Sequence, residues 1–251
     1  MQNARIKKLI HWSKKPGTQK KDGICIVEGE REIMRAILSG WLIRDLFLCE
    51  ESDLVSKLQE YSPILCSKDV FSRLVVRQGT IMSLAVFERP IQDLSNLDLP
   101  KNPLLLILDG LEKPGNVGAL LRTANSVGVD AVIFSSLKCD PLGTNSIRNS
   151  IGGIFNTQWA QSNSSNVQKL LVDLEITPYL MHLSGAKSPF EMDFIGPSAI
   201  ILGSEDKGLG PSWEKIKSHK LKIPMNGIVD SLNVSVAGAI ILYEVLRQRS
   251  I

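Results

Sequence analysis

The first 90 residues alternate between short apolar runs and segments with helical periodicity. Ile6, Leu9 and Ile10 recur at helical spacing, which predicts an amphipathic helix over residues 3–13. Further along, the predicted strands are 24–29, 42–50, 63–67 and 83–88, and the predicted helices are 30–41, 53–62 and 68–76. Strands and helices in alternation indicate a small α/β domain.

Two local patterns in this half lead to specific expectations. The stretch KKPGTQKKDG (14–23) combines proline, glycines and lysines, so we expect no regular element there. In the helix predicted at 30–41, the apolar side chains form a stripe of the kind that faces a core, made of Ile33, Met34, Ile37, Leu38 and Trp41.

A change of pattern separates this half from the rest of the chain. The segment RPIQDLSNLDLPKNP (89–103) contains three prolines and has no periodicity, which predicts a linker. The run LLLILDG (104–110) is then continuously apolar, as in a central strand of a parallel sheet. We therefore expect a first domain at 1–90, a linker at 91–103 and a second α/β domain at 104–251.

The first of three polar loops in the second domain follows that strand. In DGLEKPGNVGALLRTANSVG (109–128), Asn116 suits the N-cap of a helix. The buried stripe of this helix is expected to be Val117, Leu120, Leu121 and Ala124. Arg122 falls on another face, near the carboxyl end of the strand, where parallel sheets bind ligands.

The second loop, AIILGSEDKGLGPSWEKI (199–216), is rich in glycine. Gly203, Gly208 and Gly210 permit tight turns and close approach by a ligand. Neither a Walker loop nor a G-x-G-x-x-G dinucleotide fingerprint is present in the chain. Glu205 stands between these glycines, just past the end of a strand; alone, such an acid is typical of a solvated loop.

The third loop precedes the last predicted helix, in LKIPMNGIVDSLNVSVAGAIILYEVL (221–246). A short strand ends at Pro224, and we expect a helix from near Ser231, capped by Asp230 or Ser231. Asn233 then lies in the first turn, where an amide is a poor helix former. Ser231 and Asn233 either satisfy backbone groups or serve a site. The apolar face of the helix is expected to comprise Val236, Ala239, Ile240 and Tyr243.

Composition narrows the class of protein. The 251 residues are 43% hydrophobic and 22% charged, typical of a soluble protein with a sizeable core. We expect no signal peptide and no membrane span, because no apolar run approaches about 18 residues, and we place the protein in the cytoplasm. No cysteine pair or histidine stands at ligand spacing, so we expect reduced thiols and no metal; the cysteines are Cys25, Cys49, Cys66 and Cys139.

Charge is unevenly distributed along the chain. Seven basic residues and no acidic residue occur within 1–21, and subtracting these seven from the net charge of +3 leaves −4 on the remainder. A basic leader is a common feature of proteins that contact phosphate backbones, and it is also typical of a solvated tail.

Taken together, the three loops resemble a known family. NVGALLRTANSVG, ILGSEDKGLG and IPMNGIVDSLNVSVAGAIILYE are similar, in order and spacing, to the three signature motifs of the SpoU (TrmH-like) RNA ribose 2′-O-methyltransferases. RNSIGGIF (148–155) is similar to the family's stretch after the first motif. Residues 20–90, with IVEGEREIMRAI as the best-matching piece, resemble the substrate-binding domain that often precedes this catalytic domain and has the fold of small RNA-binding ribosomal proteins.

The resemblance implies a fold, a cofactor and partners. It implies a SPOUT α/β domain with a parallel sheet, whose C-terminal part forms a deep trefoil knot, and an obligate homodimer with cofactor pockets near the interface. It implies S-adenosylmethionine as methyl donor and RNA as substrate, with ribosomal RNA favoured over transfer RNA.

The resemblance also implies roles for eight residues. In the family, the equivalents of Gly203, Ile223 and Leu232 line the cofactor pocket. Catalysis or substrate positioning is assigned to the equivalents of the other five, which are Asn116, Arg122, Glu205, Ser231 and Asn233. Asp206 departs from the family pattern, which often has a small residue there, and adds a charge beside the cofactor loop.

The three motifs contain no histidine, so we expect a site that acts mainly by positioning the reactants. Arg122 is always protonated and is expected to bind the target phosphate or developing negative charge, while a phosphate oxygen or a carboxylate takes the proton. Alternatives are a transfer RNA 2′-O-methyltransferase, a base-methylating SPOUT relative and a non-catalytic RNA-binding protein of the same fold. Against a nucleotide-dependent oxidoreductase stands the missing glycine fingerprint.

Overall fold

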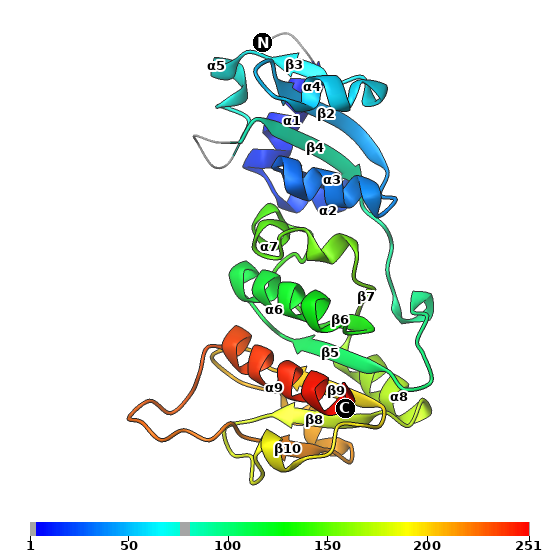
Figure 1. Ribbon diagram of the computed structural model, residues 1–251, viewed down its shortest axis with the longest axis vertical. Helices are drawn as coiled ribbons and strands as arrows, with labels where there is room; N and C mark the ends of the chain where they lie inside the picture. The colour runs from blue at the N-terminus through cyan, green and yellow to red at the C-terminus, as the bar shows by residue number, and fades with distance from the viewer. Residues whose placement is uncertain (1–3, 76–80, 251) are drawn as a thin grey trace. The chain divides into compact units, whose positions relative to one another are not determined.

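The computed structural model describes residues 4–75 and 81–250, which form two compact units (Figure 1). Unit 1 contains the chain up to Ile91 together with Leu142–Asn156, and unit 2 contains Gln92–Pro141 and the chain from Thr157 onward. The sequence pattern places residues 142–156 in the second domain, whereas their contacts are with the first unit.

Unit 1 is built around a four-stranded mixed sheet in the order β1-β4-β2-β3. β4 pairs antiparallel with β1 and β2, and β3 pairs parallel with β2. The strands are β1 (Ile24–Glu28), β2 (Ile43–Cys49), β3 (Ile64–Cys66) and β4 (Ser83–Glu88), and the helices are α1 (Ala4–Lys14), α2 (Gly17–Lys21), α3 (Glu30–Leu38), α4 (Leu54–Lys57), η1 (Gln59–Tyr61), α5 (Lys68–Phe71), α7 (Thr144–Asn149) and η3 (Gly153–Phe155). All predicted strands of the first domain are confirmed; residue 3 and residue 76, which end two predicted helices, lie outside the described residues.

The basic N-terminal segment is part of the folded core of unit 1. α1 buries Ile6, Leu9 and Trp12 against the sheet. The Trp12 indole donates a hydrogen bond to Asp22 (2.7 Å), and Gln19 on α2 donates to the Trp12 carbonyl (3.2 Å). The expectation that 14–23 lacks regular structure is therefore wrong, because Gln19 and Trp12 give this short segment a tertiary anchor. A solvated tail is excluded for the described part of this segment.

The apolar stripe expected on α3 is only partly buried. Ile33 is fully buried, whereas Leu38 is 81% exposed and Trp41 follows the end of the helix. Trp41 instead packs edge-on against Phe155 (4.8 Å between ring centroids) and donates a hydrogen bond to its carbonyl (3.2 Å). Arg35 donates a hydrogen bond to the Ile151 carbonyl. Trp41, which the helical period placed on the core-facing stripe, thus contacts the segment 142–156 instead, and Arg35 contacts the same segment.

Unit 2 contains a six-stranded sheet in the order β10-β8-β9-β5-β6-β7. All neighbouring strands in it are parallel, as the continuous apolar run at 104–110 predicted. The elements are η2 (Leu94–Asn96), β5 (Leu104–Asp109), α6 (Pro114–Val127), β6 (Ala131–Ser135), β7 (Trp159–Ser162), α8 (Ser164–Asp173), β8 (Thr177–Met181), η4 (Pro189–Glu191), β9 (Ser198–Leu202), η5 (Pro211–Lys215), β10 (His219–Leu221) and α9 (Val234–Arg249).

Helices cover both faces of this sheet. Leu105 and Ile107 of β5 point to the face covered by α8 and η5, where Trp213 is fully buried. α6 and α9 lie side by side over the other face (Figure 1). Gly238 allows this close packing, because a Cβ there would approach Leu120 to 2.3 Å and Leu202 to 2.8 Å. α9 is thereby fixed over the end of β9.

The buried face of α9 differs from the expected one. The helix buries Gly238, Ile241, Leu242, Glu244 and Val245. Val236 and Tyr243 belong to the face expected in the core, yet they are 47% and 53% exposed. The helix is apolar on both sides, so its sequence does not show which side faces its own core.

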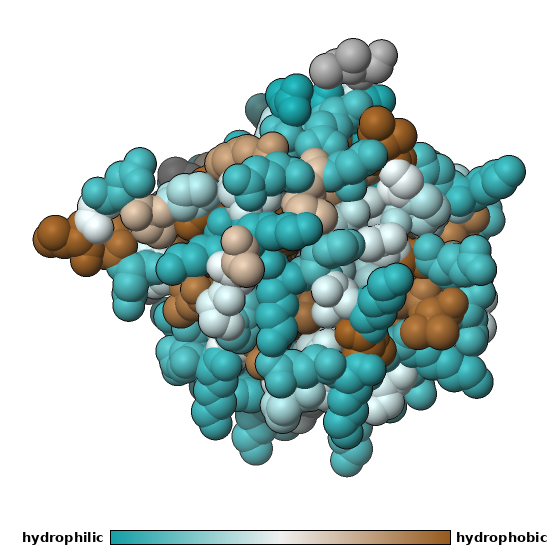
Figure 2. Space-filling model, turned by 90° about the horizontal axis from the view of Figure 1, so that it is seen from below, coloured by the Kyte–Doolittle hydropathy of each residue, from teal (hydrophilic) through white to brown (hydrophobic). Residues whose placement is uncertain are grey.

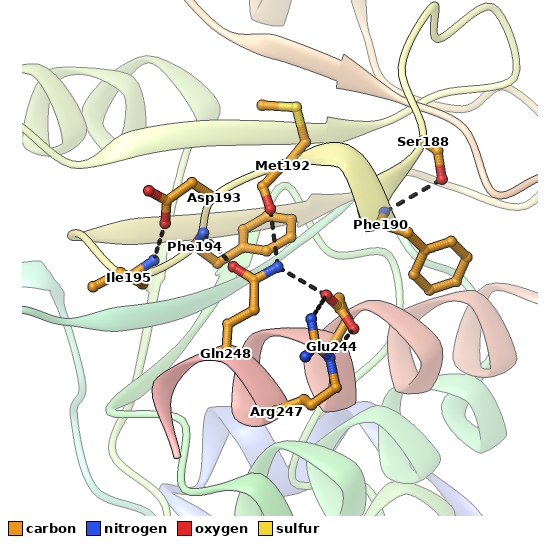
Figure 3. Close-up of polar contacts among 9 residues, drawn as sticks. All are labelled: Ser188, Phe190, Met192, Asp193, Phe194, Ile195, Glu244, Arg247 and Gln248. Carbon is orange, nitrogen blue, oxygen red and sulfur yellow. Dashed lines mark hydrogen bonds and ion pairs between the residues drawn. The ribbon is translucent and has the colours of Figure 1, made fainter. Parts of the chain in front are cut away.

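The last turns of α9 hold the segment between β8 and β9 in place (Figure 3). Gln248 donates a hydrogen bond to the Met192 carbonyl and accepts one from the Phe194 amide, both at 2.9 Å. Glu244 is almost fully buried and accepts hydrogen bonds from Arg247 (2.9 and 2.8 Å) and from Gln248 (2.8 Å). The hydrogen bonds from Arg247 and then Gln248 lower the pKa of Glu244 to about 2.

This network predicts a stability loss that depends on pH. The pKa of Glu244 is lower in the folded protein than its ordinary value, so its carboxylate stabilises the fold at pH values above that ordinary value. This stabilisation is lost as the pH falls toward 2. We expect Glu244→Gln to lower the free energy of unfolding by about 1–2 kcal/mol at pH 7. Urea titrations should show the gap to wild type narrowing from pH 4.5 downward. Glu175→Gln, at an exposed acid, is the control; a gap independent of pH would contradict the assignment.

Candidate functional site

A cavity of about 610 Å³ lies at the carboxyl ends of β8, β9 and β10 and beside the start of α9. Ligands of open α/β sheets bind at this edge, where the strand order changes direction. The wall is made of residues 181–183, 202–208, 221–223, 225 and 230–234, together with Lys113 and Ala237.

The structure brings most of the predicted site residues together around this cavity. Six of the eight line it, namely Gly203, Glu205, Ile223, Ser231, Leu232 and Asn233. Asn116 is attached to two of these six by hydrogen bonds of its side chain. Arg122 is not among the residues of the wall.

A chain of side-chain hydrogen bonds links the three predicted loops. The Asn233 amide nitrogen donates to Asn116 Oδ1 (3.2 Å), and the Asn116 amide nitrogen donates to Glu205 Oε1. Both ends fix the direction of this chain. Asn233 Oδ1 accepts from the Ser235 backbone N–H (2.8 Å), so its nitrogen must face Asn116; a carboxylate can only accept, so the Asn116 nitrogen must face Glu205.

Two expectations about helix caps are wrong, and the corrections change the roles of Asn116 and Asn233. α6 begins at Pro114 with Lys113 in the cap position, and that side chain makes no capping bond. Asn116 lies in the first turn, so its amide is available to Glu205 and Asn233. α9 begins at Val234, and its cap is Asn233, neither Asp230 nor Ser231. Asn233 therefore caps the helix with its oxygen and joins the chain with its nitrogen.

The glycines of the second loop allow its backbone to fold tightly. Ser204 and Gly208 exchange two backbone hydrogen bonds (3.1 and 2.9 Å), which fold 204–208 back on itself. A Cβ on Gly203 would lie 2.3 Å from the Gly208 carbonyl carbon, so only glycine fits at that position. This tight fold holds Glu205 at the cavity wall.

Arg122 lies apart from the other predicted residues within its own chain. It follows Asn116 by six residues, which is about 9 Å along the axis of α6. Its side chain is exposed, and it forms no hydrogen bond or ion pair with any described residue.

Lysines and acids alternate at one side of the cavity. Glu112 pairs with Lys138, and this hydrogen bond, then the charge of Lys138 and the weaker fields of Lys207 and Lys113, lowers the pKa of Glu112. Asp206 lines the cavity and acts on Lys138, whose pKa is raised mainly by Glu112 and less by Asp206. The extra charge of Asp206 is thus balanced by neighbouring lysines.

The sequence patterns missed His182, which lines the cavity directly after β8. Pro178 lies within β8 and hid this strand, because proline in a run argues against an interior strand. The rule that ligands gather at carboxyl ends of parallel strands would have found His182 once β8 was known. The three motifs contain no histidine, and His182 lines the cavity from outside them.

Neither a metal cluster nor a membrane helix occurs in the described ranges. Within 4–75 and 81–250, no group of three or more His, Cys, Asp or Glu residues could hold a metal ion. No helix over those residues is long and apolar enough to cross a membrane. Cys49, Cys66 and Cys139 are free thiols, and burial, followed by the charge of Asp140, raises the pKa of Cys139 to about 11. That thiol is protonated at neutral pH and is a poor nucleophile.

Two family models match this chain. The SpoU rRNA Methylase family matches residues 103–243, and the MRM3-like substrate binding domain matches residues 3–85. A 23S rRNA (uridine(2479)-2'-O)-methyltransferase of Streptomyces viridochromogenes is 28% identical over 90% of this chain and 84% of its own length. The 23S rRNA (guanosine(2553)-2'-O)-methyltransferase RlmP of Bacillus subtilis is 26% identical over 97% of both chains.

The fold is also similar to solved structures. The SpoU methyltransferase AviRb from Streptomyces viridochromogenes, in complex with the cofactor AdoMet, has a TM-score of 0.91 at 26% identity and covers 99% of each chain. An RNA 2'-O ribose methyltransferase structure has a TM-score of 0.84 at 31% identity, covering 100% of this chain and 98% of its own.

The double role of Asn233 predicts different stability effects for two substitutions. Asn233→Ala loses the cap of α9 and should lower the free energy of unfolding by about 1 kcal/mol. Asn233→Asp retains a capping oxygen at the positive end of the helix and should stay within about 0.5 kcal/mol of wild type. Urea unfolding of both variants at pH 7 tests this, and equal losses would show that the cap contributes nothing.

Proposed function

Because this chain belongs to the SpoU rRNA Methylase family, whose model matches more than half of it, we propose that it methylates a ribose 2′-hydroxyl of ribosomal RNA with S-adenosylmethionine as donor. The observation that carries this proposal is the meeting of three loops at one cavity through Glu205, Asn116 and Asn233. Relatives that cover most of the chain are named as 23S rRNA 2'-O-methyltransferases, which supports the substrate class.

The cavity suits the cofactor in size and chemistry. Its volume of about 610 Å³ falls within the roughly 300–1,000 Å³ that hold small ligands. Ile223, Leu232 and Met225 provide apolar walls for the adenine, and Gly203 keeps the loop backbone close to the ligand. S-adenosylmethionine, when bound, supplies an electrophilic methyl group on a sulfonium, so the protein's own task is positioning and electrostatics.

The difficult partner is the ribose hydroxyl, a weak nucleophile at neutral pH. Ser231 and the two asparagines, Asn116 and Asn233, hold it in line with the methyl carbon. Alignment of two reactants can lower a barrier by roughly 7–11 kcal/mol, which accounts for a site that needs no metal. The Glu205 carboxylate or a phosphate oxygen of the RNA would take the hydroxyl proton, while the bond from oxygen to the methyl carbon would replace the bond from that carbon to sulfur and S-adenosylhomocysteine would leave.

Arg122 binds the phosphate next to the target ribose. Its guanidinium stays protonated in proteins and cannot act as a base, whereas its planar fork matches a phosphate in bidentate fashion. An exposed Arg122 without a protein partner among the described residues is available for such a ligand.

The proposed enzyme acts as a homodimer with its cavities near the interface. The exposed apolar face of α9, with Val236 and Tyr243, needs a cover. A loop projects between β10 and α9 (Figure 1), and Ile228 within it is fully exposed. Apolar atoms stand out at the left end of Figure 2. A monomer in sedimentation equilibrium at micromolar concentration would contradict this arrangement.

We also propose that the chain of unit 2 is knotted. Leu221 is bound on one side by the His182 amide (2.9 Å), and the following Lys222 amide donates to Lys187 on the other side (2.9 Å). A Cβ on Gly185 would lie 2.5 Å from the Leu221 carbonyl carbon, so the loop 182–187 closes tightly around the end of β10. This arrangement supports threading of the C-terminal part through that loop; an experimental chain trace that leaves 221–222 outside it would contradict the knot.

Unit 1 binds the RNA, and the enzyme works in the cytoplasm. The match of residues 3–85 to a substrate-binding domain and the exposed lysines of α1 and α2 support RNA contact. Ribosomal RNA as substrate and the free thiols of Cys49, Cys66 and Cys139 fit a reducing compartment.

A methyl-transfer assay tests the proposed function. Wild-type protein with tritiated S-adenosylmethionine should label ribosomal RNA, and alkaline digestion should leave the label in dinucleotides, because a 2′-O-methyl group blocks cleavage. The variants Asn233→Asp and Arg122→Lys should bind the cofactor normally but react at least about 10-fold more slowly. Asn233→Asp loses the hydrogen-bond donor to Asn116, and Arg122→Lys loses the planar guanidinium that binds a phosphate. Label in bases, label only in transfer RNA, or cofactor binding without transfer would each contradict the proposal.

Charge substitutions test the role of α1 and α2 without removing their core residues. Replacing Lys7, Lys14, Lys15 and Lys20 by glutamine should weaken RNA binding and reduce the slope of log K against log salt by roughly 0.7–0.9 per lost phosphate contact. Affinity for S-adenosylmethionine should not change. The control replaces four exposed lysines of unit 2 in the same way, Lys101, Lys169, Lys215 and Lys217. An unchanged salt slope in the first variant would refute the role.

A further inference from the structure

His182 follows β8 and lines the cavity, but it belongs to none of the three motifs. Its Nδ1 lies 3.1 Å from the Ser184 backbone nitrogen and 2.7 Å from Ser184 Oγ. These contacts fix the imidazole ring at the start of the loop 182–187.

The contact with Ser184 also fixes which ring nitrogen carries the proton. A backbone N–H can only donate, so Nδ1 must present its lone pair. In the neutral ring, the proton is therefore on Nε2. No described residue accepts a hydrogen bond from Nε2. The nearby acid Glu214, which senses the charge of His182, is already bound by Lys220 at 2.7 Å. The ring thus offers an unpaired donor at the wall of the cavity.

The place of this donor indicates which part of a ligand it meets. β9 lies between β8, which carries His182, and β5, which precedes Asn116, so two strand spacings of about 5 Å separate the two ends. The methyl transfer takes place at the Asn116 end, so His182 faces the distant half of the ligand. Apolar side chains line the cavity on this side, with Met181 at the end of β8, Leu221 at the end of β10 and Leu183 in the loop after His182, and they suit a flat, uncharged ring system.

We propose that His182 is a further cofactor-binding residue, whose Nε2–H donates a hydrogen bond to the adenosine half of S-adenosylmethionine. This assignment rests on the proposed function, and it adds a polar contact to the apolar adenine walls. The competing explanation is that the ring only fastens the loop through Ser184.

Two substitutions separate these roles. Asn places its side-chain amide near the position of Nδ1, so His182→Asn keeps an acceptor for Ser184 but lacks the outer donor. His182→Gln places an amide nitrogen near the position of Nε2. Calorimetric titration with S-adenosylhomocysteine should show a Kd about 5- to 10-fold higher for His182→Asn and within about 3-fold of wild type for His182→Gln. In turnover, His182→Asn should raise KM for the cofactor while kcat and KM for RNA stay constant. His11→Asn, at an exposed histidine of α1, is the matched control.

A second ligand identifies the half of the cofactor that is bound. 5′-Methylthioadenosine lacks the amino-acid part, so His182→Asn should weaken its binding by the same factor as that of S-adenosylhomocysteine. A loss seen with S-adenosylhomocysteine alone would overturn the assignment to adenosine. Equal losses for the Asn and Gln variants, or no loss for either, would also overturn it. Binding of both ligands by the wild-type protein would in that case still support the cofactor of the proposed function. Wild-type protein that binds neither ligand would overturn both.

Discussion

The site depends on one chain of hydrogen bonds that runs from the cap of α9 through Asn116 to Glu205. Its direction is set at both ends, by a backbone N–H that must donate and by a carboxylate that must accept. Each of the three residues comes from a different loop, and the loops are far apart in the sequence. Through side-chain contacts alone, this chain links the cap of α9, the first turn of α6 and the loop after β9.

The rest of unit 2 keeps the ends of this chain in place. Gly238 lets α9 pack closely on α6 and β9, which brings the cap at Asn233 to the first turn of α6. The tight fold at Gly203 places Glu205, and the contacts of Gln248 with Met192 and Phe194 hold the segment before β9. The absence of a side chain at Gly203 and Gly238 allows the close packing that positions the three polar residues of the chain.

Sequence patterns predicted the α/β class and the parallel sheet. The family resemblance implied eight site residues, and six of them line the cavity. Sequence patterns failed where tertiary contacts outweigh local preference. The cap of α9 is Asn233 because the helix starts later than its capping signals suggest, and α2 exists because Gln19 reaches the Trp12 carbonyl. Helical periodicity could not show which apolar side of α9 faces the core. Pro178 concealed β8, and with it the position of His182.

The most direct measurement of the central claim is the rate of methyl transfer in the double variant Glu205→Gln with Asn233→Asp. These two changes reverse every donor and acceptor along the chain, so Asn116 can rotate its amide and make both bonds in the opposite direction. The account predicts that the double variant is several-fold faster than Asn233→Asp alone, a coupling of about 1 kcal/mol or more. If instead the double variant is as slow as the product of the two single effects, the three residues act separately and the chain does not organise the site.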